Sequence, residues 1–336
     1  MRIIIHCGTH KTGSTTIQTA LHENAKELSG YHYHCIVNSP RINARNANKF
    51  DKEWIIKTVR DAESSGVENF IFSAELFSTL TSDEWKKITD LLSEHEITFI
   101  VFFRHWVNFL PSKWAQYCLR CDTQSFPRFL AQLKRHKDQH LDARFALLIE
   151  RLISVKPAEI KAVSYDNAIS SDGLLTTCFS AFGMPENFVN RFSDSKMHLN
   201  VRKPRLDTEV IRLLNGIYAD KYGIAQDGKF NQFLRNKPPG KFYMEKMLSS
   251  LRDTDVLSDL HSELIASEVT VTLSRNDLSF ILWEESFLAL VSDYSVNSIS
   301  GEFFKDIDPI DFRCSQVEIE ELRPSLKQKL VELIEI

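Results

Sequence analysis

The chain has little of what a fibrous, low-complexity or disulfide-stapled protein needs. Its 336 residues include 11 glycines, 10 prolines and 6 cysteines. So few glycines and prolines exclude a collagen-like or linker-like sequence. The cysteines are scattered without a disulfide framework, so we expect reduced thiols. Cys118 and Cys121 form a single Cys-x-x-Cys, and one such pair does not supply the four ligands of a zinc site.

Long hydrophobic runs are also missing. No stretch approaches the roughly 20 apolar residues that span a bilayer, so no membrane span is expected. The apolar run at the start, Ile3–Ile5, is too short for the core of a signal peptide. Together with the reduced thiols, these features predict a cytoplasmic protein.

Neither sign of charge is in large excess. The chain carries 41 lysines and arginines against 45 aspartates and glutamates, a formal net charge of −4. A balance so close to neutral gives no support for nucleic-acid binding, so no nucleic-acid partner is expected. Any site for an anion must therefore be built from a few local groups.

The first half of the chain alternates short apolar runs with helical patterns. Buried strands are predicted at Ile3–Cys7, Val67–Phe72, Thr98–Phe103 and Ile160–Tyr165. One of the intervening helices begins with the capping box Thr81–Glu84, and another, Leu174–Phe182, ends at Gly183. Strands separated by helices predict an α/β fold with a central parallel sheet flanked by helices.

After about residue 187, helical patterns dominate. We expect residues 1–215 to form the α/β core and residues 216–336 a mainly helical C-terminal elaboration. This second part is expected to pack on the core rather than to fold as an independent domain. No internal repeat is present.

The segment between the first strand and the first helix carries the strongest chemical signal. Residues 8–16 read Gly-Thr-His-Lys-Thr-Gly-Ser-Thr-Thr. Small residues let backbone N–H groups turn toward an anion, and the start of the following helix adds partial positive charge. Ser14, Thr15 and Thr16 offer hydroxyl groups, and Lys11 brings a full charge. The segment therefore predicts a site for a phosphate-like group.

The same segment differs from a Walker A loop, which requires Gly-Lys-Ser/Thr after a four-residue gap. Gly8 and Gly13 have that gap, but Ser14 follows Gly13 directly and Lys11 precedes it. A nucleotide triphosphatase also needs an aspartate at a strand end to hold Mg²⁺. Arg104 follows the strand Thr98–Phe103 instead, which disfavours that class.

Three features of the sequence resemble sulfotransferases that use 3′-phosphoadenosine-5′-phosphosulfate (PAPS). The segment His10–Gln18 resembles their phosphosulfate-binding loop. Arg104 and Ser112 match an arginine at a strand end followed eight residues later by a serine, and Tyr165–Asp166 fits an aromatic-acidic pair that closes a later strand. The likeness covers about residues 1–215 and is greatest to bacterial members that act on glycans or small hydroxyl compounds.

The resemblance implies a three-layer, P-loop-like fold and a metal-free reaction. A sulfuryl group would pass in line from PAPS to a hydroxyl or amine acceptor, such as a carbohydrate or a small metabolite, leaving 3′,5′-ADP. Lys11 would stabilise the charge that develops on the leaving phosphate. By the same resemblance the donor would be bound by His10, Lys11, Thr12, Gly13, Ser14, Thr15, Thr16, Arg104, Ser112 and Tyr165.

The acceptor needs a base, and several residues are candidates. Glu75 follows the strand Val67–Phe72, at the sheet edge where ligands bind, and its apolar flanks would make a carboxylate more basic. A structural carboxylate is an equally good interpretation. His6, His10 and His22 flank the loop and are alternative bases.

Two other classes of function stay open. One is a P-loop kinase or nucleotide-binding protein that uses ATP and Mg²⁺. The other is a non-catalytic relative that binds another protein through its helical last third. Neither the acceptor nor the oligomeric state is indicated by the sequence.

Overall fold

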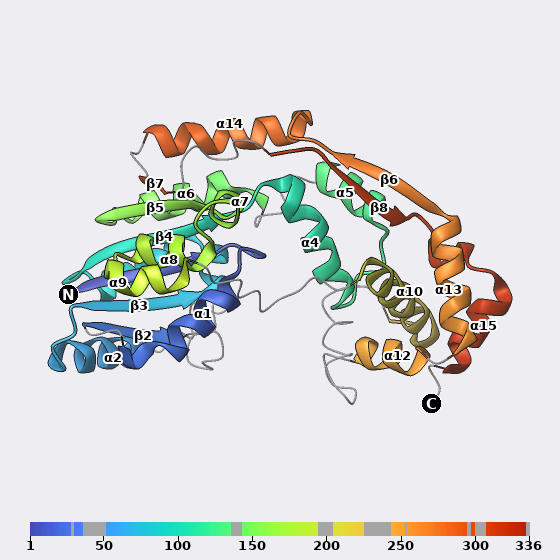
Figure 1. The fold of residues 1–336 in the computed structure, drawn as a ribbon, viewed down its shortest axis with the longest axis horizontal. Helices are drawn as coiled ribbons and strands as arrows, with labels where there is room; N and C mark the ends of the chain where they lie inside the picture. Colours follow the sequence, from blue (N-terminus) through green and yellow to red (C-terminus); the bar gives the residue numbers. More distant parts are fainter. Residues whose placement is uncertain are drawn as a thin grey trace. The chain divides into compact units, whose positions relative to one another are not determined.

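The structure is a computed structural model that describes residues 1–27, 30–35, 52–135, 143–193, 204–224, 243–252, 254–293, 297–299 and 307–333. The chain divides into two compact units (Figure 1). The sheet unit comprises residues 1–106, 138–201 and 276–307. The helical unit comprises residues 107–137, 202–275 and 308–336.

The sheet unit is built on a parallel sheet in which every neighbouring pair of strands is parallel. Among the described residues its order is β2-β3-β1-β4-β5-β7 (Figure 1). The strands are β1 (Arg2–Gly8), β2 (Tyr31–Cys35), β3 (Asn69–Ala74), β4 (Glu96–Phe103), β5 (Glu159–Ser164) and β7 (Asn297–Ile299). The prediction of an α/β fold with a parallel sheet is confirmed, whereas β2 and β7 were not predicted.

Strand β1 lies at the centre of the sheet. Ile5 pairs with Phe72 on β3 and with Phe99 on β4. Both faces of β1 are buried, as the continuous apolar run predicted. The chain leaves β1 toward β2 on one side and leaves β4 toward β5 on the other. The β1–β4 boundary is therefore a topological switch point, where ligands bind beyond the carboxyl ends of the strands.

Helices cover both faces of this sheet (Figure 1). On one face Ile17 of α1 and Phe179 of α8 share a buried cluster with Phe102 of β4. On the other face Trp85 of α3 packs edge-on against Phe99. The helical segments of the unit are α1 (Ser14–Glu23), η1 (Ala25–Glu27), α2 (Lys52–Ser64), η3 (Glu75–Thr79), α3 (Ser82–Leu91), α6 (Phe145–Ser154), α7 (Tyr165–Ser170), α8 (Leu174–Phe182), α9 (Glu186–Val189), η6 (Asn190–Phe192) and α14 (Leu278–Asp293).

The helical unit surrounds the long helix α10 (Arg205–Tyr222), which is buried almost throughout from Thr208 to Ala219. Around it lie the other elements of the unit, α5 (Phe126–Arg135), α12 (Tyr243–Leu251), α13 (Asp255–Ala266), η8 (Ile319–Glu321), α15 (Pro324–Leu333) and the antiparallel strands β6 (Glu268–Leu273) and β8 (Ile310–Ser315). Helix α4 (Trp106–Cys118) begins at the last residue of the sheet unit's first segment. Across the described ranges, every helix is too short or too polar to cross a bilayer.

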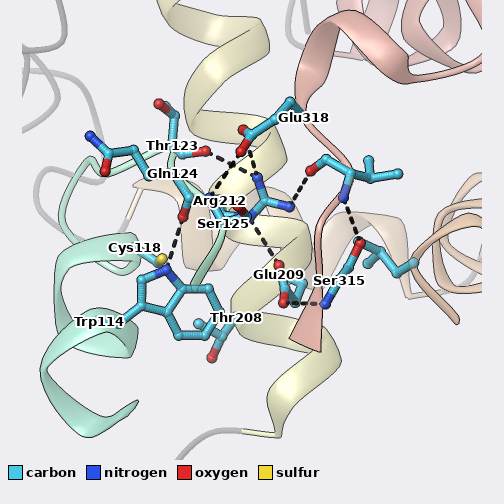
Figure 2. Close-up of polar contacts among 12 residues, drawn as sticks. Trp114, Cys118, Thr123, Gln124, Ser125, Thr208, Glu209, Arg212, Ser315 and Glu318 are labelled. Carbon is cyan, nitrogen blue, oxygen red and sulfur yellow. Dashed lines mark hydrogen bonds and ion pairs between the residues drawn. The ribbon is translucent and has the colours of Figure 1, made fainter. Parts of the chain in front are cut away.

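A buried ion pair joins the segments of the helical unit (Figure 2). The guanidinium of Arg212, fully buried on α10, lies 2.9 Å from Glu209 Oε2. It also donates to the carbonyl oxygens of Thr123 and Val317, at 3.0 and 2.6 Å. The other oxygen of Glu209 accepts the Ser315 N–H at 3.0 Å. Two distant segments of the sequence, at Thr123 and at Ser315–Val317, are thereby tied to one helix.

The division into units differs from the predicted boundary at residues 215/216. That boundary falls inside α10, and residues 276–307 return to the sheet unit. The expected mainly helical C-terminal part also contains β6 and β8. Pairing of segments far apart in sequence leaves no local signal, which is why helical periodicity alone did not reveal this arrangement.

Candidate anion-binding site

The turn between β1 and α1 has an unusual backbone. Lys11 has φ 66° and Gly13 has φ 75°. In the described part of the chain only Lys156 shares a positive φ with Lys11 among non-glycine residues. A lysine in this region costs of order 1–3 kcal/mol and persists only where its surroundings enforce it. The turn is therefore held in shape by its neighbours.

Two buried threonines supply part of that restraint. The hydroxyl of Thr9 donates to the carbonyl oxygen of Phe102, at 2.8 Å, and so fixes the turn to β4. The hydroxyl of Thr12 donates to the carbonyl oxygen of Thr9, at 2.6 Å. The Thr12 hydroxyl, predicted to contact the donor, thus points into the turn itself.

The start of α1 follows directly. Gly13 is the N-cap and gives no side-chain cap, and the Ile17 N–H is bonded to the Gly13 carbonyl at 3.1 Å. The N–H groups of Ser14, Thr15 and Thr16 precede this bond and lie at the open end of the helix. The Ser14 hydroxyl is buried and has no hydrogen-bond partner. Buried hydroxyls are nearly always bonded, so this one fits a ligand oxygen placed at the helix start.

Close packing explains both glycines of the loop. A side chain at Gly8 would place its Cβ 1.8 Å from Ser14 Oγ. One at Gly13 would meet Leu174 Cδ2 at 2.3 Å and Tyr165 Cε2 at 3.3 Å. Only glycine lets the backbone of the turn pack this closely against Ser14, Leu174 and Tyr165.

Arg104, at the end of β4, lies beside the turn. Its Nη1 donates to the Lys11 carbonyl oxygen at 3.3 Å, and its Nε lies 3.8 Å from Asp166 Oδ1. Its guanidinium carbon is 5.1 Å from the centroid of the Tyr165 ring. Burial raises the pKa of the Tyr165 phenol, although the Arg104 charge acts in the opposite direction. The structure thus brings together Lys11, Arg104 and Tyr165, which the resemblance had grouped.

Glu75 and His10 meet at the same edge of the sheet. Glu75 begins η3 directly after β3, and its Oε2 lies 3.4 Å from His10 Nδ1. The His10 side chain is 12% exposed and that of Glu75 is 35% exposed, and His10 Nδ1 itself is buried. The two candidate bases are therefore neighbours rather than independent alternatives.

The other two histidines do not fit the role of a base. His22 is exposed in the last turn of α1, about 12 Å along the helix from the loop. His6 is fully buried, and its Nδ1 lies 2.7 Å from Ser73 Oγ, which also accepts from Gln18 at 3.2 Å. Burial lowers the pKa of His6 to about 4, while Glu75 acts weakly in the opposite direction. His6 is therefore a neutral structural residue.

Ser112 lies on the part of α4 that belongs to the helical unit, and its hydroxyl donates to the Asn108 carbonyl oxygen at 3.2 Å. Its contact with a donor stays a prediction. Sequence reasoning also missed Thr9 and Ser73, whose roles depend on neighbouring strands and leave no motif. Within the described ranges, no group of three or more His, Cys, Asp or Glu side chains gathers to hold a metal ion.

Searches among family models, curated proteins and solved structures found no match to this chain.

Proposed function

We propose that the chain is a PAPS-dependent sulfotransferase that transfers a sulfuryl group to a hydroxyl or amine acceptor. The observation that carries this proposal is the buried, unpartnered hydroxyl of Ser14 at the open end of α1. Ser14 begins α1 three residues after Lys11, beside the unbonded backbone N–H groups of the first helical turn. This arrangement suits a multiply charged, oxygen-rich anion such as a phosphosulfate.

The topology supports a P-loop-like fold for this site. The loop follows the central strand β1, whose neighbours are β3 and β4, and it opens a helix at the switch point of a parallel sheet. Arg104 ends the adjacent strand β4, where an acidic metal ligand would stand in a nucleotide triphosphatase. A cation at this position favours a reaction without a metal ion.

The chemistry uses groups of this chain. The acceptor oxygen attacks sulfur while the bond between sulfur and the bridging phosphate oxygen breaks. Negative charge grows on the leaving phosphate, where Lys11 and the helix N-terminus stabilise it. The proton of the acceptor passes to the pair formed by His10 and Glu75, whose side chains lie 3.4 Å apart. The products are the sulfated acceptor and 3′,5′-ADP.

The experiment incubates the chain with PAPS and EDTA and measures 3′,5′-ADP by anion-exchange chromatography. The acceptors are para-nitrophenol, a mixture of monosaccharides, and water alone. Wild type is expected to release 3′,5′-ADP, and Lys11→Ala to do so about 10²–10³-fold more slowly with little change in donor binding. An exposed lysine on α3, Lys86, provides the control variant Lys86→Ala, which should keep wild-type turnover. Consumption of ATP with Mg²⁺ but not of PAPS would instead indicate a kinase, and no turnover of either would indicate a binding module.

A further inference from the structure

Arg104 contacts both the β1–α1 turn and the start of α7. Its Nη1 donates to the Lys11 carbonyl oxygen in the β1–α1 turn, at 3.3 Å. On the opposite side, Asp166 and the Tyr165 ring approach it from the start of α7. The guanidinium therefore bridges the turn and the end of β5.

Asp166 is itself fixed. Its Oδ2 accepts the backbone N–H of His105 at 2.7 Å, while its Oδ1 faces Arg104 at 3.8 Å. The Asp166 side chain is 11% exposed and that of Arg104 is 23% exposed. Charges this shielded from water interact more strongly than a surface pair, so the carboxylate restrains the guanidinium.

Arg104 contacts the turn at Lys11, the residue with the strained backbone. Lys11 is the left-handed non-glycine residue of the turn, and its carbonyl direction sets the path of the chain into Gly13. The Thr9 hydroxyl donates to the Phe102 carbonyl oxygen, and the Thr12 hydroxyl donates to the Thr9 carbonyl oxygen. Neither hydroxyl bonds to the Lys11 peptide. A charged donor forms a stronger hydrogen bond to a carbonyl than a neutral one does.

We infer that Arg104, fixed by Asp166, is a positioning residue. It holds the Lys11 carbonyl and thereby the shape of the anion-binding turn, and it does not discriminate the 3′-phosphate of the donor. The resemblance to sulfotransferases implies direct contact between this arginine and the donor, so the two roles are distinguishable. The consequence for sulfuryl transfer rests on the proposed function, whereas the consequence for the turn does not.

The first experiment measures hydrogen–deuterium exchange of the full chain without any nucleotide. In Arg104→Ala and Arg104→Lys, exchange of the Ile17 N–H, which is bonded to the Gly13 carbonyl oxygen of the turn, should rise about tenfold or more, because a lysine cannot serve Lys11 and Asp166 together. Exchange in β4 should stay unchanged in both variants. The control is Arg191→Ala, which removes the exposed pair of Arg191 with Glu27 in the same unit and should leave the Ile17 N–H protected. Wild-type protection of the Ile17 N–H in Arg104→Ala would overturn the inference.

The second experiment compares the affinities of 3′,5′-ADP and 5′-AMP by calorimetry. In Arg104→Ala both should weaken by a similar factor of about ten or more, so that their ratio is kept. Loss of the ratio would show that Arg104 reads the 3′-phosphate and would overturn the inference.

Asp166→Asn gives the sharpest contrast, because it removes a negative charge near the anion site. Simple electrostatics then predicts tighter anion binding, whereas a positioning role predicts weaker binding and faster exchange of the Ile17 N–H. Tighter binding with an unchanged turn would contradict the inference. If wild type binds neither nucleotide, the proposed function fails, and the exchange measurement still decides the role of Arg104.

Discussion

Lys11 and Gly13 both have positive φ, but for different reasons. Glycine is the residue that meets Leu174 and Tyr165 without a clash, and it takes up the left-handed conformation freely. Lysine has no such freedom, so its strain has to be offset by hydrogen bonds to the turn. At the scale of single residues, the site is a strained turn stabilised by its neighbours.

The pairing of His10 with Glu75 predicts that they act as one unit. Glu75→Gln and His10→Gln should each lower sulfuryl transfer by about 10²-fold, and the double variant should be no slower than the slower single variant. Affinity for 3′,5′-ADP should stay at the wild-type value in Glu75→Gln. The measurement is single-turnover transfer from PAPS, with His22→Gln as the control because His22 is exposed at the far end of α1. Losses that simply multiply in the double variant would show that the two residues act independently.

The depressed pKa of His6 predicts a pH-dependent stability. Its pKa is about 4 in the folded chain, because the ring is buried, and about 6.5 in the unfolded chain. The neutral form stabilises the fold, so this contribution is complete above about pH 6.5 and is lost as the pH falls through about 4. This contribution of His6 to the free energy of unfolding amounts to roughly 3 kcal/mol.

Urea unfolding of wild type and His6→Gln across this pH range measures the effect. The free energy of unfolding of wild type should fall more steeply with decreasing pH than that of the variant, since carboxylates titrate equally in both. Parallel curves would mean that His6 ionises as readily in the folded state as in the unfolded state.

At the scale of elements, the sequence predicts segments whose signals are local. The apolar runs of β1 and β4, the capping box at Thr81 and the left-handed C-cap at Gly183 are confirmed. Strand β2 reads Tyr-His-Tyr-His-Cys and has too little apolar character to be recognised. In β6, valines alternate with threonines, a strand signal that was overlooked among the surrounding helices.

The start of α1 predicts the effect of a methyl group at Gly13. Gly13→Ala should weaken binding of 3′,5′-ADP at least tenfold, because the new Cβ would lie 2.3 Å from Leu174 Cδ2 and either this side chain or the loop would have to move. Gly66→Ala is the matched control, since Gly66 has φ 73° but nothing within 4 Å of an added Cβ. Both variants should lose about 1–2 kcal/mol of stability from the left-handed backbone, but only Gly13→Ala should lose affinity. Equal affinities in the two variants would show that the loop is not the nucleotide site.

At the scale of the whole molecule, each unit has its own core. The sheet unit closes around β1 and β4, and the helical unit closes around α10. The closeness of Lys11 to Arg104 was predictable because both residues follow strand ends in one unit and lie within short motifs. The roles of Thr9 and Asp166 were not predictable, because each depends on a hydrogen bond to a neighbouring strand or loop.

The Arg212 ion pair predicts a large effect on the helical unit. Arg212→Ala leaves Glu209 buried without its partner, and burial already raises the pKa of that carboxyl. The unit should lose about 3–5 kcal/mol of stability. Hydrogen exchange should accelerate in α10 and β8 while β4 keeps its protection. Equal acceleration in β4 would show that the two units unfold together.

The proposal that the start of α1 binds the nucleotide of PAPS without metal is tested most directly by calorimetry. The experiment titrates 3′,5′-ADP in EDTA into wild type, Ser14→Ala and Thr19→Ala. Ser14 carries the unpartnered hydroxyl at the start of α1, and Thr19 is a hydroxyl further along the same helix. Wild type and Thr19→Ala should bind 3′,5′-ADP equally without metal, and Ser14→Ala should bind about tenfold more weakly. Failure of wild type to bind 3′,5′-ADP, or binding of ATP that requires Mg²⁺, would contradict the account.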